Sequence, residues 1–218
     1  MKIFLASLGI TDKLAPFFLN LLRENRHSRS VPKGLIIENA SDYKGKAGQA
    51  ELRQYYKILK QHSLDYDYLD LKKYINNIAK LEAKLESADF VYISGGNIFY
   101  LYYWVVKSGL DKILKKHVMN GLVFAGSSAG SVIAGPTLKY FDSVDKTEIS
   151  PEPKNIKWEG LSLVNFVILP HWGEEKYAIR FSTLKKRLEN DGFTVKTLTN
   201  RQAFSINGSD TKLVEEPE

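Results

Sequence analysis

An apolar run that ends in a glycine-bounded serine is the feature that most constrains this chain. Residues 121–125 read Gly-Leu-Val-Phe-Ala, and residues 126–130 read Gly-Ser-Ser-Ala-Gly. The pattern predicts a buried strand that turns sharply into a helix, because glycine removes the side chains that would clash at such a turn. The turn would raise the Ser128 hydroxyl into solvent and aim the first helical N–H groups at the atom it attacks. A strand–helix turn without a catalytic role, or a phosphate-binding turn, would be compatible with the same residues.

The rest of the chain alternates short apolar runs with segments of helical periodicity. Strands are expected at residues 2–8, 34–39, 64–71, 90–93, 122–125 and 166–169, and helices at residues 14–26, 48–61, 73–87, 98–106, 110–119 and 177–190. This alternation predicts a three-layer α/β fold, with a mostly parallel sheet covered by helices on both faces. In such sheets the active site lies beyond the carboxyl ends of the strands.

The last third of the chain is less regular. Residues 136–159 are polar and without clear periodicity, which indicates an excursion over the site. Residues 194–198 and 203–206 are expected to pair as a terminal hairpin. No repeat, low-complexity tract or linker divides the 218 residues, so a single domain over residues 1–218 is expected.

Composition disfavours several classes of protein. Hydrophobic residues make up 44% of the chain and charged residues 26%, as in ordinary globular proteins. No run approaches the ~20 apolar residues of a membrane span, and the apolar start at residues 1–6 is too short for a signal peptide, so a cytoplasmic protein is expected. The absence of cysteine excludes a disulfide, a thiolate metal site and a cysteine nucleophile. The net charge of +6 is scattered, which favours solvated helix faces over nucleic-acid binding.

One of the four histidines follows a buried strand directly. His171 comes after the apolar run at residues 166–169, so its strand end falls on the same edge of the sheet as Ser128. A serine hydroxyl becomes a good nucleophile only when a neighbouring base takes its proton, and His171 is the candidate base. A packing role for His171 is the alternative. The other three fall in polar turns or at a helix end: His27, His62 and His117.

Acyl transfer also needs two N–H donors for the developing oxyanion. One candidate is the N–H of Ala129, directly after the serine. The other is the N–H of Gly96, where the pair Gly95-Gly96 follows a predicted strand and lets the backbone approach a substrate closely. Two glycines that merely end a strand are the simpler interpretation.

Three motifs together resemble the dipeptidase E family of serine peptidases, which are relatives of cyanophycinase. They are Val-Tyr-Ile-Ser-Gly-Gly-Asn-Ile-Phe at 91–99, Gly-Ser-Ser-Ala-Gly at 126–130 and Leu-Pro-His at 169–171. The resemblance implies a flavodoxin-like fold, similar to class I glutaminase domains, with no metal and no organic cofactor. The best-known members of this family cleave dipeptides that begin with aspartate.

The resemblance also implies roles for individual residues. Ser128 is the nucleophile, His171 the base, Gly96 and Ala129 the oxyanion donors, and Asn97 a side chain that positions the substrate. The family tends to carry a carboxylate in a late strand–turn, where this chain has asparagine.

Asn200 occupies that late position as the third catalytic member. An amide can orient the imidazole but supplies no charge. Four acidic residues therefore remain alternatives for this role: Glu174, Glu175, Asp142 and Asp145. Lys176 falls near the place where the family has an arginine for the aspartyl side chain, with Arg180 one turn further on. A helix-surface role is the alternative for both cations.

The sequence thus predicts a small cytoplasmic serine peptidase, a monomer or homodimer, that cleaves short peptides through an acyl-enzyme. An esterase of the α/β-hydrolase type is an alternative, but the spacing between Ser128 and His171 is short and no His-Gly-Gly motif precedes the serine. A catalytically silent binding module that kept the pocket and lost its acid is a second alternative, and Asn200 keeps it open.

Overall fold

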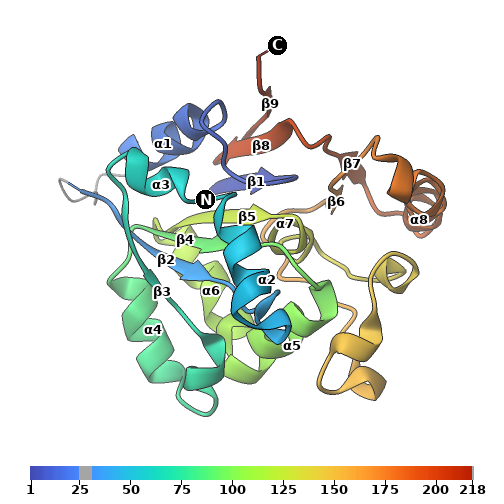
Figure 1. Ribbon diagram of the computed structural model, residues 1–218, viewed down its shortest axis with the longest axis horizontal. Coiled ribbons are helices and arrows are strands. Elements are labelled where there is room, and N and C mark those ends of the chain that lie inside the picture. Colours follow the sequence, from blue (N-terminus) through green and yellow to red (C-terminus); the bar gives the residue numbers. More distant parts are fainter. Residues whose placement is uncertain (25–30, 218) are drawn as a thin grey trace.

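A seven-stranded sheet forms the centre of the molecule (Figure 1). The computed structural model describes residues 1–24 and 31–217. The strands of this sheet are β1 (Lys2–Ala6), β2 (Lys33–Ile37), β3 (Asp65–Tyr68), β4 (Phe90–Ile93), β5 (Val123–Ser127), β8 (Gln202–Asn207) and β9 (Asp210–Glu215). Their order is β3-β2-β4-β5-β1-β8-β9. From β3 to β1 each neighbouring pair is parallel, whereas β8 and β9 are antiparallel additions. The expected mostly parallel sheet is confirmed.

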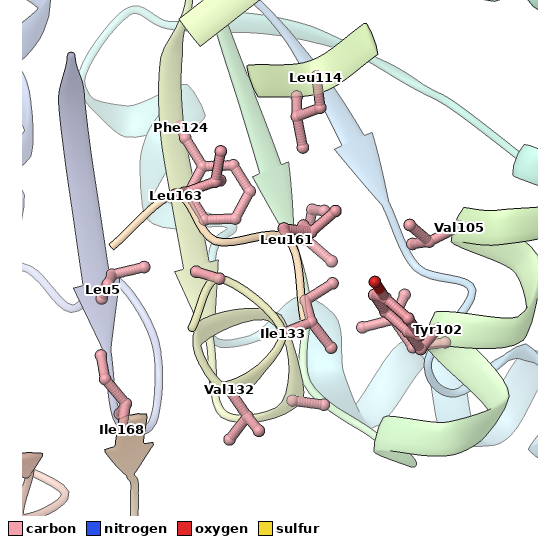
Figure 2. Close-up of a cluster of buried hydrophobic side chains, with 14 of the residues drawn as sticks. Leu5, Tyr102, Val105, Leu114, Phe124, Val132, Ile133, Leu161, Leu163 and Ile168 are labelled. Carbon is pink, nitrogen blue, oxygen red and sulfur yellow. The ribbon is translucent and has the colours of Figure 1, made fainter. Parts of the chain in front are cut away.

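Helices cover both faces of the sheet because successive residues of its strands point to opposite sides. Phe4 of β1 packs with Phe18 of α1 (Ala15–Arg23), in a core cluster that also includes Leu59 of α3 (Ile58–Gln61). Leu5 belongs to the opposite core, where Figure 2 shows it with Phe124 of β5 and with side chains of α5 and α7. That second face is covered by α4 (Ile78–Glu86), α5 (Ile98–Ser108), α6 (Leu110–Met119) and α7 (Ala129–Val132). The expected three layers are therefore present.

The other helices depart modestly from the sequence expectation. The segment expected as one helix at 48–61 divides into α2 (Gly45–Arg53) and α3, and the segment at 73–87 begins only at Ile78. The expected helix at 14–26 runs partly outside the described residues. The late helix α8 (Ala178–Asn190) matches its expected range within one residue. No helix among the residues that the structure describes is long and apolar enough to cross a membrane.

The expected terminal hairpin of residues 194–198 with 203–206 is wrong. Instead β6 (Val167–Leu169) and β7 (Val195–Thr197) pair in parallel as a small separate sheet. The hairpin is formed by β8 and β9, which pair across Gly208 and Ser209. Gly208 has φ +62°, the conformation that tight two-residue hairpin turns require. Asn200 therefore lies in a turn between β7 and β8 and belongs to neither strand.

The polar excursion at residues 136–159 is built from three short 3-10 helices, Phe141–Ser143, Thr147–Ile149 and Pro153–Asn155. A β-bridge between Thr137 and Glu159 closes its base. Phe141 is buried in the core, so the excursion is packed against the protein as well as tied at its ends.

Candidate active site

Ser128 lies at the sharp turn between β5 and α7. Its φ of +47° and ψ of −113° fall in a region that residues with a side chain rarely adopt. The Ser128 N–H holds this conformation by donating to the carbonyls of Ala6 (3.2 Å) and Ser7 (3.0 Å). Next to it, a Cβ at Gly130 would lie 2.1 Å from the carbonyl oxygen of Ile93. The turn is therefore pressed against the end of β4, which explains the glycine at this position.

His171 meets Ser128 across this edge of the sheet. The Ser128 Oγ and the His171 Nε2 are 2.9 Å apart. His171 follows β6 with φ +57°, and its backbone N–H donates to the Ser7 Oγ at 2.7 Å. Ser7 directly follows β1 and is fully buried. The ends of β1, β5 and β6 thus place hydroxyl and imidazole in contact.

Asn200 contacts the other side of the imidazole. Its Oδ1 lies 2.6 Å from the His171 Nδ1 and accepts the Ser7 hydroxyl at 3.3 Å, while its Nδ2 donates to the Glu174 Oε1 at 2.7 Å. Because the Asn200 Nδ2 faces a carboxylate, its Oδ1 must accept from a protonated Nδ1. The lone pair of Nε2 is then available to the Ser128 hydroxyl.

The protonation of His171 favours the same arrangement. Burial lowers the pKa of His171, and the charge of Lys176 lowers it further, whereas Asn200 and Glu174 raise it. The pKa remains below its ordinary value, so the imidazole is neutral at pH 7 and can accept a proton.

A pocket of about 100 Å³ opens over these two residues. Gly96 and Ala129 border it together with Ser128 and His171, as their predicted role in an oxyanion site requires. Most of the remaining wall is apolar and comprises Ile98, Val132, Phe141, Val144, Tyr177 and Phe181. The Tyr177 ring stacks on the imidazole with a centroid separation of 5.7 Å. The excursion at 136–159 supplies part of this wall, as the sequence predicts.

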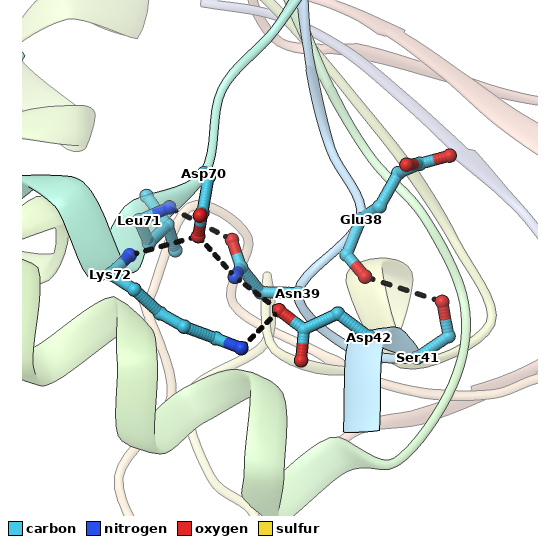
Figure 3. A network of polar contacts seen from close by, with 7 residues as sticks. All are labelled: Glu38, Asn39, Ser41, Asp42, Asp70, Leu71 and Lys72. Atoms are coloured by element: carbon cyan, nitrogen blue, oxygen red, sulfur yellow. Dashed lines mark hydrogen bonds and ion pairs between the residues drawn. The ribbon is translucent and has the colours of Figure 1, made fainter. Parts of the chain in front are cut away.

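A polar network joins the segments that follow β2 and β3 (Figure 3). Asn39 donates to Asp42 (2.8 Å) and Asp70 (3.0 Å), and its Oδ1 accepts the N–H of Leu71 (3.0 Å). These bonds fix Asn39, and therefore the segment that continues into Ala40.

Ala40 in turn contacts the glycine loop directly. The carbonyl of Ala40 accepts the N–H of Asn97 at 2.8 Å, and a Cβ at Gly96 would lie 2.1 Å from the same oxygen. Gly96 has φ +144°, so both conformation and space require glycine there.

Asn97 caps α5 and anchors the excursion. Its Oδ1 accepts the N–H of Tyr100 at 2.8 Å, and its Nδ2 donates to the Asp145 Oδ1 (2.7 Å) and the carbonyl of Lys146 (2.9 Å). The Asp145 Oδ2 also accepts the N–H of Ile98 at 2.7 Å. Both ends of the Asn97 amide are thus occupied within the protein. Its role in positioning substrate stays a prediction.

The remaining candidates lie farther from the imidazole or face solvent. Asp142 and Glu175 are exposed, and Asp145 borders the pocket but is engaged with α5. Burial raises the pKa of Asp145. Lys176 is exposed with its Nζ 4.7 Å from the centre of the Tyr177 ring, and Arg180 is exposed on α8.

Sequence reasoning missed one residue of the site and misjudged the burial of others. Ser7 could have been found, because it is a polar residue directly after a buried strand on the same edge. His117 is buried in the last turn of α6 and His62 is half-buried, and neither lines the Ser128 pocket. His27 lies outside the described residues. No group of three or more metal-ligating side chains occurs among the residues that the structure describes.

Comparison with known proteins identifies a family for the chain as a whole. The sequence model of peptidase family S51 matches residues 14–214. An uncharacterized peptidase of Pasteurella multocida (strain Pm70) is 26% identical over 98% of this chain and 96% of its own length. Peptidase E of Streptomyces coelicolor is 38% identical over 90 residues, which are 41% of this chain and 35% of that protein.

Two solved structures share the fold. A Listeria monocytogenes EGD-e protein, provisionally assigned as a Peptidase E, superposes with a TM-score of 0.78 at 23% identity and 98% coverage of both chains. A peptidase from an acI-B1 Actinobacterium has a TM-score of 0.74 at 17% identity, covering 98% of this chain and 87% of its own. These matches are consistent with the flavodoxin-like fold that the resemblance implies.

We expect Gly130→Ala to destabilise the protein and displace the Ser128 turn. The added methyl group would overlap the carbonyl of Ile93, and overpacking of this kind costs about 1–3 kcal/mol. Gly135→Ala is the control and should lower the free energy of unfolding by less, because its Cβ would lie 3.0 Å from the nearest atom, the carbonyl oxygen of Phe166. Urea unfolding would measure both. Equal free energies of unfolding for Gly130→Ala and the wild type would contradict the close approach.

Proposed function

Since the chain belongs to peptidase family S51, we propose that it is a serine peptidase that hydrolyses short peptides through Ser128 and His171. The observation that carries this proposal is the 2.9 Å contact between the Ser128 Oγ and the His171 Nε2, made by a serine on a strained strand–helix turn. An activated hydroxyl needs a base within this distance whose other nitrogen is oriented by a third group. Asn200 is that third group.

The proposed reaction proceeds through an acyl-enzyme. The Ser128 Oγ attacks the peptide carbonyl while the His171 Nε2 takes its proton. The N–H groups of Gly96 and Ala129 stabilise the oxyanion, and Nε2 then returns the proton to the departing amine. Water then attacks the acyl carbonyl while the same imidazole takes its proton, and this proton passes to the Ser128 Oγ as the bond between Oγ and the acyl carbon breaks. Asn200 keeps Nδ1 protonated, so that Nε2 remains the basic nitrogen throughout.

We expect Ser128→Ala and His171→Ala each to lose peptidase activity by roughly 10³-fold or more, because nucleophile and base act as a unit. The measurement is release of free amino acids from a dipeptide panel. Ser127→Ala is the matched control: its hydroxyl accepts from the Tyr92 hydroxyl at 2.7 Å and is expected to be dispensable for the reaction.

Two outcomes would count against the proposal. Unchanged release in both variants would discard the roles of Ser128 and His171. A folded wild-type protein that cleaves no peptide of the panel would favour a binding module of the same fold.

The pH dependence of kcat/KM should reflect the lowered pKa of His171. Burial lowers the pKa of His171, and only the neutral imidazole can accept the proton of Ser128. The acidic limb of kcat/KM should therefore have its midpoint below 6.5, the ordinary histidine pKa, with activity lost as pH falls through that midpoint. A midpoint above 6.5 in a pH series of dipeptide hydrolysis would contradict this assignment.

The pocket wall supports a preference for uncharged side chains. His171 is neutral, so the acidic side chain of Asp145 is the source of charge in this lining; its carboxylate would repel an acidic substrate group, and most of the other lining residues are apolar. Lys176 does not border the pocket, and its Nζ lies 4.7 Å from the centre of the Tyr177 ring. We therefore infer that an aliphatic side chain is accepted in preference to an aspartyl one.

Dipeptides that begin with leucine should be cleaved with a kcat/KM at least about tenfold above that for dipeptides that begin with aspartate. Val144→Arg places a cation in the wall and should shift this ratio towards aspartate. If the wild type prefers aspartate and Lys176→Ala abolishes that preference, the Lys176 ammonium binds the acid and the inference is wrong.

A further inference from the structure

Glu174 carries a negative charge next to the amide that stands where the family tends to have an acid. We propose that Glu174 is the acid of this site and acts on His171 through the side chain of Asn200. The inference rests on the proposed peptidase function. It makes Glu174 a positioning residue, since the carboxylate touches neither Ser128 nor the substrate pocket.

An unbroken chain of contacts leads from the nucleophile to Glu174. Ser128 Oγ to His171 Nε2 is 2.9 Å, His171 Nδ1 to Asn200 Oδ1 is 2.6 Å, and Asn200 Nδ2 to Glu174 Oε1 is 2.7 Å. Hydrogen bonds in such a chain polarise one another. A carboxylate at Nδ2 draws the amide proton towards itself and leaves more negative charge on Oδ1, which faces the imidazole.

The turn after β6 places Glu174 within reach of this amide. Gly173 has φ +91°, and the N–H of Glu174 donates back to the carbonyl of His171 at 3.2 Å. The base and the acid therefore sit on one tight turn. Glu174 is half-buried, which strengthens its interaction relative to a fully solvated carboxylate.

The other charged groups near the imidazole do not stabilise its protonated form as Glu174 does. Lys176 is a cation and disfavours the imidazolium, and the Tyr177 ring packs on the imidazole face. Asp145 borders the same pocket but binds Asn97 and the backbone of α5. The charge of Glu174 favours the imidazolium that forms when His171 takes the serine proton.

The amide of Asn200 is required for this arrangement. The side chain must accept from Nδ1 and donate to the carboxylate at the same time, and asparagine does both. An aspartate at position 200 would face Glu174 at hydrogen-bond distance, with two like charges and no donor between them. Asparagine at 200 and glutamate at 174 therefore work as a matched pair.

The test uses the full chain and a dipeptide that the wild type cleaves. Glu174→Gln keeps an oxygen that can accept from Asn200 but removes the charge, so kcat should fall roughly tenfold, the difference between a charged and a neutral hydrogen bond. Asn200→Asp should also lose activity, because two carboxylates would then face each other with no donor between them. The double variant Asn200→Asp with Glu174→Gln restores one charge and one donor, and should be at least about tenfold more active than Asn200→Asp alone.

A titration separates the electrostatic role from a merely structural one. In NMR spectra of the imidazole C–H protons, Glu174→Gln should lower the pKa of His171, and the acidic limb of kcat should move to lower pH with it. The exposed neighbour Glu175 supplies the control, because Glu175→Gln should change neither. Wild-type values of both kcat and the His171 pKa in Glu174→Gln would overturn the proposal.

The same titration keeps this inference distinct from the proposed function. If the wild type cleaves no peptide, the peptidase proposal fails, while the His171 pKa still reports whether the charge of Glu174 reaches the imidazole. If peptides are cleaved and the double variant is no more active than Asn200→Asp, the pairing of positions 174 and 200 is refuted while the peptidase proposal stands.

Discussion

The site depends on one strained turn, in which Ser128 takes a left-handed conformation at the end of β5. Two carbonyls of the β1 end, at Ala6 and Ser7, accept its N–H, and Gly130 lets the turn lie against β4. The strain is offset by these contacts with the two neighbouring strands, so the hydroxyl is positioned by the ends of central strands of the sheet. The pocket and the histidine are arranged around that fixed point.

Ser7 connects this turn to the rest of the site. Its carbonyl binds the Ser128 N–H, and its hydroxyl both accepts the N–H of His171 and donates to Asn200. One buried residue after β1 thus contacts Ser128, His171 and Asn200. Each of these three comes from a different segment of the sequence, so their relative placement is a property of the sheet rather than of any local motif. Precision in a site of this kind requires such support from rigid elements.

The sequence predicts most of the fold and the centre of the site, because both follow from local patterns. Apolar strands and a glycine-bounded serine identify β5 and its turn, and a histidine after a buried strand identifies the residue that meets Ser128. The pairing of β8 with β9, in place of the expected hairpin with residues 194–198, could not be predicted in this way, since β9 is almost entirely exposed and lacks an apolar strand pattern. The contact between Asn200 and Glu174 could not be predicted from the sequence either, because it depends on how two turns that are distant in the sequence meet.

The two sides of the pocket differ in what they are made of. Its floor, at Gly96 and around Ser128, is main chain compressed between neighbouring strand ends, where the carbonyl of Ala40 leaves no volume for another side chain. Its wall includes Phe141 and Val144 from the 136–159 excursion, which Asn97 fastens to α5 through Asp145. Under the proposed function, a change in that excursion would alter which substrates fit the pocket and leave Ser128 and His171 in place, because the two parts are held by different contacts.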